Sequence, residues 1–219
     1  MLSSLFHFAD VIAVCTAAVT GVLAAAAIRA DIFGAVVLGC TTAFGGGILR
    51  DLILGVTPPS ALRDPMMLIM AAAVSALTFL LEYLFGDKTT GERVVRERTR
   101  HEQLLNVMDA LSLSMFVIVG IDAAVAAGYA DNAFLTVFVG VITGVGGGVI
   151  RDVMIGRVPV ILQKRIYALA ALLGAVIDVS LMRAGVSSPI SAAAALSFII
   201  IIRLLAMHFR WNLPRYPKY

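Results

Sequence analysis

The sequence predicts an all-α, polytopic membrane protein with seven transmembrane helices, arranged as two inverted three-helix repeats plus a seventh helix. Three observations support this prediction: the composition, seven long stretches that are almost free of charge, and a motif that occurs twice. Of the 219 residues, 60% are hydrophobic and 14% are charged, whereas a soluble domain is about 25% charged. This composition excludes an ordinary soluble enzyme, a disordered chain and a secreted disulfide scaffold.

Seven stretches are long and apolar enough to cross a bilayer, which takes about 20 helical residues. Five of them contain no Asp, Glu, Lys or Arg, and the other two contain one acid each, Asp109 and Asp178. In chain order they are residues 11–28, 32–49, 65–81, 103–121, 132–150, 166–182 and 184–202. Because the connections are short, we expect residues 1–219 to form a single membrane domain.

The distribution of Lys and Arg predicts the orientation, because cytoplasmic connections carry an excess of positive charge. With seven spans, all 17 basic residues except Arg50, Arg63 and Arg183 fall on one side of the membrane. We therefore expect the N-terminus outside and the C-terminus in the cytoplasm. The basic segment at about 86–102 is expected to be a cytoplasmic connector, with binding of anionic lipid as an alternative. The net charge of +3 thus reflects topology, and no nucleic-acid partner is expected.

A motif of fourteen residues occurs twice, which indicates an internal duplication. Residues 45–58 read GGGILRDLILGVTP and residues 146–159 read GGGVIRDVMIGRVP, so GGGxxRDxxxGxxP is identical in both. We expect repeat one at about 8–85, repeat two at about 103–183 and an unpaired seventh helix at about 185–209. Since three is an odd number of spans, the second copy enters the bilayer inverted, and such repeats place their sites near the midplane.

Three consecutive glycines lie in the second span and again in the fifth: Gly45, Gly46, Gly47, Gly146, Gly147 and Gly148. Each glycine destabilises a helix by about 1 kcal/mol relative to alanine, so we expect both helices to bend or break there and to line a pore. Close packing of the two helices is a compatible alternative, because small residues let backbones approach. Thr42 and Thr143 either line the same pore or donate hydrogen bonds to their own helices.

An Arg–Asp pair follows each glycine cluster, Arg50–Asp51 in the first copy and Arg151–Asp152 in the second. Ionisable residues inside a membrane are costly and usually mark a functional site, which here predicts gating or binding. The alternative is structural ion pairing, with Arg50 facing Asp152 and Arg151 facing Asp51 across the pseudo-two-fold axis.

A further symmetric pair of acids, Asp10 and Asp109, lies at the starts of the first and fourth spans. These residues are expected to be helix N-caps or vestibule charges that concentrate cations. No P-loop, HExxH or GxSxG motif occurs, so the sequence predicts neither catalytic residues nor a bound metal or cofactor.

The doubled motif, together with the sequence DALSLS that begins at Asp109, resembles the prokaryotic branch of the trimeric intracellular cation (TRIC) channel family. The resemblance implies a homotrimer in a prokaryotic inner membrane, surrounded by lipid, with a pore in each protomer bounded by kinked second and fifth helices. It implies passage of monovalent cations, K⁺ or Na⁺. Animal members carry Lys-Glu-Val where this chain has Arg151-Asp152-Val153, so their gating does not transfer.

Bacterial relatives of the same group are also described as glycine transporters, and the residues are compatible with that alternative. The carboxylate of glycine suits an arginine or the N-terminus of a half-helix, and its ammonium group suits an aspartate or a free carbonyl. The sequence favours the channel and leaves the transporter open.

Overall fold

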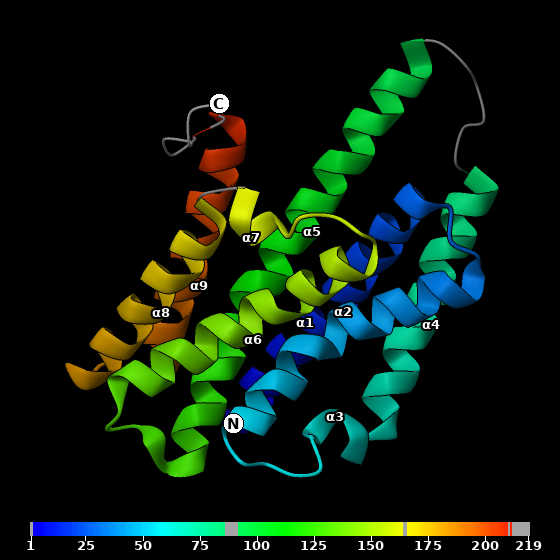
Figure 1. Cartoon of the computed structure of the whole chain (residues 1–219). Helices are drawn as coiled ribbons and strands as arrows, with labels where there is room; N and C mark the ends of the chain where they lie inside the picture. The colour runs from blue at the N-terminus through cyan, green and yellow to red at the C-terminus, as the bar shows by residue number, and fades with distance from the viewer. Residues whose placement is uncertain (1, 86–91, 164–165, 210, 212–219) are drawn as a thin grey trace, which may run out of the picture.

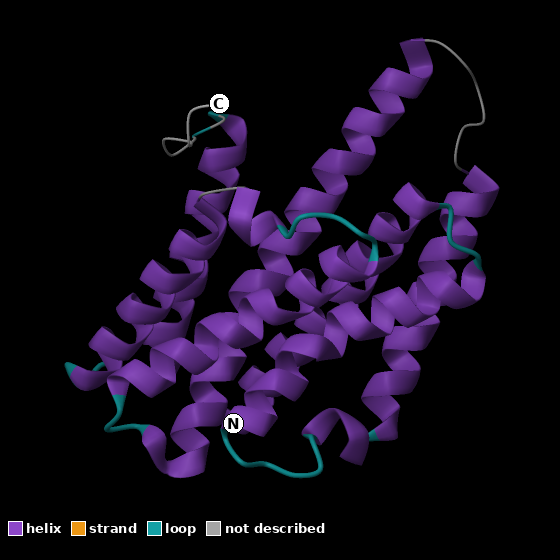
Figure 2. Ribbon diagram, in the orientation of Figure 1, coloured by secondary structure: helices purple, strands orange, loops and turns teal. Residues whose placement is uncertain are grey.

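The computed structural model describes residues 2–85, 92–163, 166–209 and 211, and its regular structure is entirely helical in these ranges (Figures 1 and 2). Within them, seven helices are long and apolar enough to span a membrane. These candidate spans are Phe6–Ile28, Ile32–Ile53, Pro65–Phe85, Gln103–Tyr129, Ala133–Met154, Ile166–Arg183 and Ser188–His208. The predicted fold class and the predicted number of spans are confirmed.

The helices follow the predicted order of two repeats and an added helix. The first repeat contains α1 (Leu2–Ala25), α2 (Ile32–Ile53), α3 (Ser60–Arg63) and α4 (Pro65–Phe85). The second contains α5 (Glu92–Ala124), α6 (Ala133–Met154), α7 (Val160–Gln163) and α8 (Ile166–Arg183), and α9 (Ser188–His208) follows. A 3₁₀ turn at Ala26–Ile28 and a π-helical segment at Val125–Tyr129 extend α1 and α5. The second and fifth spans are therefore α2 and α6.

The predicted connector at 86–102 differs from the structure in its second half. Residues 86–91 lie outside the described residues, and α5 has already begun at Glu92. This helix is 33 residues long, so part of the charged segment continues the fourth span as helix.

The two repeats pack against each other along α1, α2, α5 and α6. The helix α1 contacts α2 and α5, while α6 contacts both α2 and α5 (Figure 1). The added helix α9 packs on α8 and α5 of the second repeat. As a result 39% of the α8 span is buried, compared with 11% of the α4 span, its counterpart in the first repeat.

Backbone contact between α2 and α6 occurs at the glycine clusters. A Cβ atom at Gly46 would overlap the carbonyl oxygen of Thr143, and one at Gly147 would overlap the carbonyl oxygen of Thr42. The two contacts are reciprocal, as expected for helices related by a two-fold axis. The prediction of close packing is therefore confirmed.

The glycines do not break either helix, and a bend at the glycines stays a prediction. Both α2 and α6 remain helical from end to end, and each ends two residues after the aspartate of its Arg–Asp pair. A helix broken inside a membrane would leave backbone groups without partners, and contact with the other backbone stabilises the intact helix instead. The ends occur where Gly55 (φ 71°) and Gly156 (φ 68°) adopt the left-handed conformation that stops a helix.

The crossing predicts a sharp difference between a glycine that contacts the opposing backbone and one that does not. Gly147→Ala places a methyl group against the Thr42 carbonyl, and we expect it to lower the free energy of unfolding by about 1–3 kcal/mol. The matched control is Gly47→Ala, whose Cβ would have its nearest neighbour at 3.8 Å, on Arg50. We expect this control to be neutral or to stabilise the helix by up to about 1 kcal/mol. Thermal unfolding of the purified variants in detergent measures both, and equal losses would contradict the proposed crossing.

Candidate functional site

The first Arg–Asp pair closes the end of α2 onto the short helix α3. Arg50 Nε donates a hydrogen bond of 2.8 Å to Asp51 Oδ1. The other carboxylate oxygen of Asp51 accepts from the backbone N–H and the hydroxyl of Ser60, each at 2.6 Å. Arg50 Nη2 completes the set by donating to Ser60 Oγ at 3.1 Å. The charge of Arg50 is thus neutralised within its own repeat.

The second pair repeats this arrangement and adds another acid. Arg151 donates to Asp152 Oδ1 from Nε at 3.0 Å and from Nη2 at 2.9 Å. Its Nη1 lies 3.2 Å from Oδ1 of Asp109, on α5. The backbone N–H of Val160, at the start of α7, donates to Asp152 Oδ2 at 2.8 Å. Arg151 is 2% exposed, so its charge depends on these two carboxylates.

A residue that the motif did not include joins the second pair. Arg203, on α9, places Nη2 3.5 Å from Asp109 Oδ2 and its guanidinium carbon 4.5 Å from the ring centroid of Tyr167. The sequence could have indicated this buried arginine, because the last charge-free stretch ends at Ile202 whereas the helix continues to His208. A basic residue placed inside a long apolar helix, rather than after it, needs a buried partner.

The pairing across the pseudo-two-fold axis that the sequence suggested is wrong. Arg50 binds Asp51 and Arg151 binds Asp152, so each arginine is paired within its own repeat. The physical reason is the turn after each helix, which directs a backbone N–H at the second carboxylate oxygen and fixes each aspartate beside its own arginine.

The acids Asp10 and Asp109 are not helix N-caps, because both lie inside helices, α1 and α5, that begin well before them. Asp109 is buried in the ion pairs with Arg151 and Arg203 rather than at an open surface. Asp10 is half-buried and within electrostatic range of Arg50 and His7. A vestibule role therefore remains a prediction for Asp10.

The threonine hydroxyls next to the glycines are used inside their own helices. Thr42 donates to the carbonyl of Leu38 and Thr143 to that of Val139, each at 2.6 Å. Both residues are buried. The crossing of α2 and α6 is closed in this conformation, with Gly45 and Gly46 of α2 facing Gly146 and Gly147 of α6.

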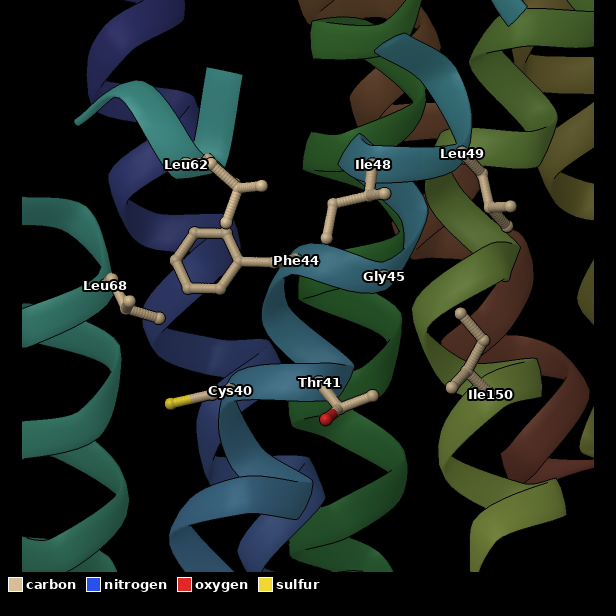
Figure 3. A pocket seen from close by; sticks show the side chains of 10 residues that line it. Cys40, Thr41, Phe44, Gly45, Ile48, Leu49, Leu62, Leu68 and Ile150 are labelled. Atoms are coloured by element: carbon tan, nitrogen blue, oxygen red, sulfur yellow. The ribbon is translucent and has the colours of Figure 1, made fainter. Parts of the chain in front are cut away.

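An apolar cavity of about 300 Å³ lies beside the crossing, on the face of α2 turned toward α3 and α4 (Figure 3). Phe44, Leu62 and Leu68 line it on one side, and Ile150 of α6 lines it beyond Gly45. The hydroxyl of Thr41, at its edge, already donates to the Val37 carbonyl. The cavity suits an acyl chain or a shifted α2 better than a hydrated ion. In the described part of the chain, no three His, Cys, Asp or Glu side chains gather as a metal site.

Inverted repeats that cross at glycine and each hold a buried Arg–Asp pair define a membrane protein with the TRIC fold. The chain is similar to the TRIC channel orthologue from Rhodobacter sphaeroides, with a TM-score of 0.83 and 30% identity over 95% of this chain and 100% of the other. It is equally similar to another TRIC cation channel, with a TM-score of 0.81 and 33% identity over 98% of each chain.

The sequence comparisons show the family. Residues 7–83 and 106–183 match the family described as Glycine transporter. The chain is 34% identical to a UPF0126 membrane protein of Vibrio cholerae, over 98% of this chain and 84% of the relative. It is 35% identical to the UPF0126 inner membrane protein YadS of Escherichia coli, over 97% and 96%. The chain belongs to this TRIC-related family.

Removing Arg151 leaves two carboxylates, Asp109 and Asp152, without their main partner. We expect Arg151→Ala to lower the free energy of unfolding by about 3–5 kcal/mol. We expect a smaller loss for Arg50→Ala, because Asp51 keeps both hydrogen bonds from Ser60. Thermal unfolding in detergent measures the difference, with the exposed Arg157→Ala as a control that stays near the wild type. Identical losses for Arg50→Ala and Arg151→Ala would contradict the unequal pairing.

Proposed function

We propose that the protein is a monovalent cation channel permeable to K⁺, with a pore inside each protomer between α2 and α6. The observation that carries the proposal is the crossing of these helices, where backbone meets backbone at membrane depth with a neutralised arginine on either side. The similarity to TRIC cation channels over nearly the whole chain supports it.

Opening requires α2 and α6 to separate, because the crossing leaves no space for an ion. The carbonyl oxygens of Thr42 and Thr143 contact the opposing glycines in this conformation. Separation would free them to face the path, and backbone carbonyls are suitable ligands for K⁺. A bare arginine would repel cations. Pairing of each arginine with its neighbouring aspartate removes most of that barrier, and Asp10 adds negative charge at one end.

The proposal extends to assembly and location. We propose a homotrimer, supported by the trimeric channels that this chain resembles. We place it in a prokaryotic inner membrane, which is where its Escherichia coli relative is described. The positive charges support an N-terminus outside and a cytoplasmic C-terminus. Lipids surround the protein, and K⁺ or Na⁺ is the permeant ion.

Transport of glycine is the second candidate, because the matching family is described as Glycine transporter. The carboxylate of glycine would displace an aspartate from Arg50 or Arg151, and its ammonium group would bind the released aspartate. The same helices would then alternate between two closed states instead of opening a continuous path.

A reversible cross-link tests whether the crossing must open. A Cβ on Gly45 would lie 3.8 Å from the Cβ of Ile150, which is the usual separation in a disulfide. In a background with Cys15 and Cys40 replaced by alanine, we expect the pair Gly45→Cys and Ile150→Cys to form a disulfide on oxidation. Oxidation should abolish the K⁺ current across a planar bilayer, and dithiothreitol should restore it. Each single variant is the control and should not respond to oxidation.

Two results would contradict the channel proposal. If the oxidised double variant conducts like the reduced one, the pore does not pass between α2 and α6. If the reduced protein carries no K⁺ current but takes up glycine saturably in liposomes, and oxidation stops that uptake, the crossing serves a transporter.

A further inference from the structure

A second buried acidic position lies in the second repeat, away from the Arg–Asp pairs. Asp178, on α8, is 2% exposed. Its Oδ1 atom has no hydrogen-bond partner within the described residues. The residue lies five positions before Arg183, where the span ends, which places it about 7 Å inside that end of the helix. A carboxylate buried this way is strongly destabilised unless something positive or a proton accompanies it.

The neighbours of Asp178 supply oxygen atoms and no positive charge. Ser191, on α9, lies close enough to the carboxylate to interact with it, and its hydroxyl donates to the Ser188 carbonyl at 3.0 Å. Among the described residues, the one charged side chain that interacts with Asp178 is another acid, Asp122 on α5. Arg183, the nearest arginine along α8, donates to the backbone carbonyl of Asp131. Three helices thus converge on two acids without a counter-charge.

The first repeat shows that its architecture does not require these acids. By the same spacing that aligns Asp10 with Asp109, Asp122 corresponds to Leu23. The backbone N–H groups of Ser60 and Val160 bind the equivalent residues Asp51 and Asp152, so Ser60 and Val160 also correspond. The same offset along the chain makes Thr78 the counterpart of Asp178. The hydroxyl of Thr78 donates to the carbonyl of Val74, in its own helix. In the first repeat, Leu23 and Thr78 therefore occupy the positions where the second repeat has Asp122 and Asp178.

We infer that Asp178, Asp122 and Ser191 form a binding site for one monovalent cation, K⁺ or Na⁺. Carboxylate, hydroxyl and carbonyl oxygens are the ligands that such hard cations bind, and the ion supplies the missing positive charge. Among the described residues no third His, Cys, Asp or Glu side chain joins these two acids, which favours a monovalent ion over a divalent metal. The ion reaches the site from the half-buried side chain of Asp122, next to the exposed residues 126–130 that follow α5.

This site is separate from the crossing of α2 and α6, and the inference holds for a channel and for a transporter alike. It lies between α5, α8 and α9, so a bound cation ties the added helix to the second repeat. In a channel the ion would stabilise the protomer beside the pore. In a transporter it would be placed to act as a coupling ion.

The site is tested through stability instead of transport. Thermal unfolding of the purified protein is measured in detergent while KCl or NaCl replaces choline chloride at constant ionic strength. We expect the wild type to gain about 5 °C in Tm, saturably, as the cation occupies its site. Asp178→Asn should lose this gain. Asp131→Asn removes an exposed acid in the loop after α5 and should keep it.

Each outcome decides the inference. No gain over choline in the wild type, or an unchanged gain in Asp178→Asn, would overturn it. A Tm that changes with pH but not with KCl or NaCl would also overturn it and assign a proton to Asp178. A gain that CaCl₂ gives and the monovalent salts do not would overturn the choice of ion. If Asp178→Asn does not fold, Ser191→Ala replaces it, and we expect its apparent affinity for K⁺ to fall about tenfold.

Discussion

The contact of two backbones at Gly46 and Gly147 is the constraint on which the rest of the structure depends. Because no side chain lies between them, α2 and α6 approach so closely that a backbone carbonyl of each helix contacts a glycine of the other. The Arg–Asp pairs, one turn further along each chain, then lie on either side of the contact. The flanking helices α1 and α5 occupy equivalent positions in the two repeats. The helix α1 packs on α2, α5 packs on α6, and α1 and α5 contact each other.

Buried charge is handled differently in the two halves of the molecule. In the first repeat a hydroxyl, Ser60, supplements the pairing of Arg50 with Asp51. In the second, Arg151 shares Asp109 with Arg203, so α9 is tied into the ion pairs. Separating the second arginine from its partners disturbs three helices, whereas separating the first disturbs one short helix. The two ends of the crossing therefore differ in how easily they can open.

Composition and spacing predicted the fold because both follow from the bilayer itself. Span length, charge asymmetry and a repeated motif depend on local sequence. The partners of Arg50 and Arg151 could not be predicted from the sequence, because each arginine could be neutralised equally well by the aspartate of its own repeat or by that of the other repeat. Only the turns after α2 and α6 decide between them. The burial of Asp178 was equally hidden, since it depends on α9 covering α8, a contact between helices that no motif marks.

The odd number of spans in each repeat has a consequence for divergence. Two identical half-chains inserted in opposite directions would rebuild the crossing, but every substitution would then appear on both faces of the membrane. A single chain holding both copies removes that restriction. Asp122 and Asp178 have no acidic counterparts in the first copy, and Arg203 belongs to the added helix, which packs on the second copy. Fusion is thus what lets a symmetric scaffold present chemically different surfaces to the two compartments.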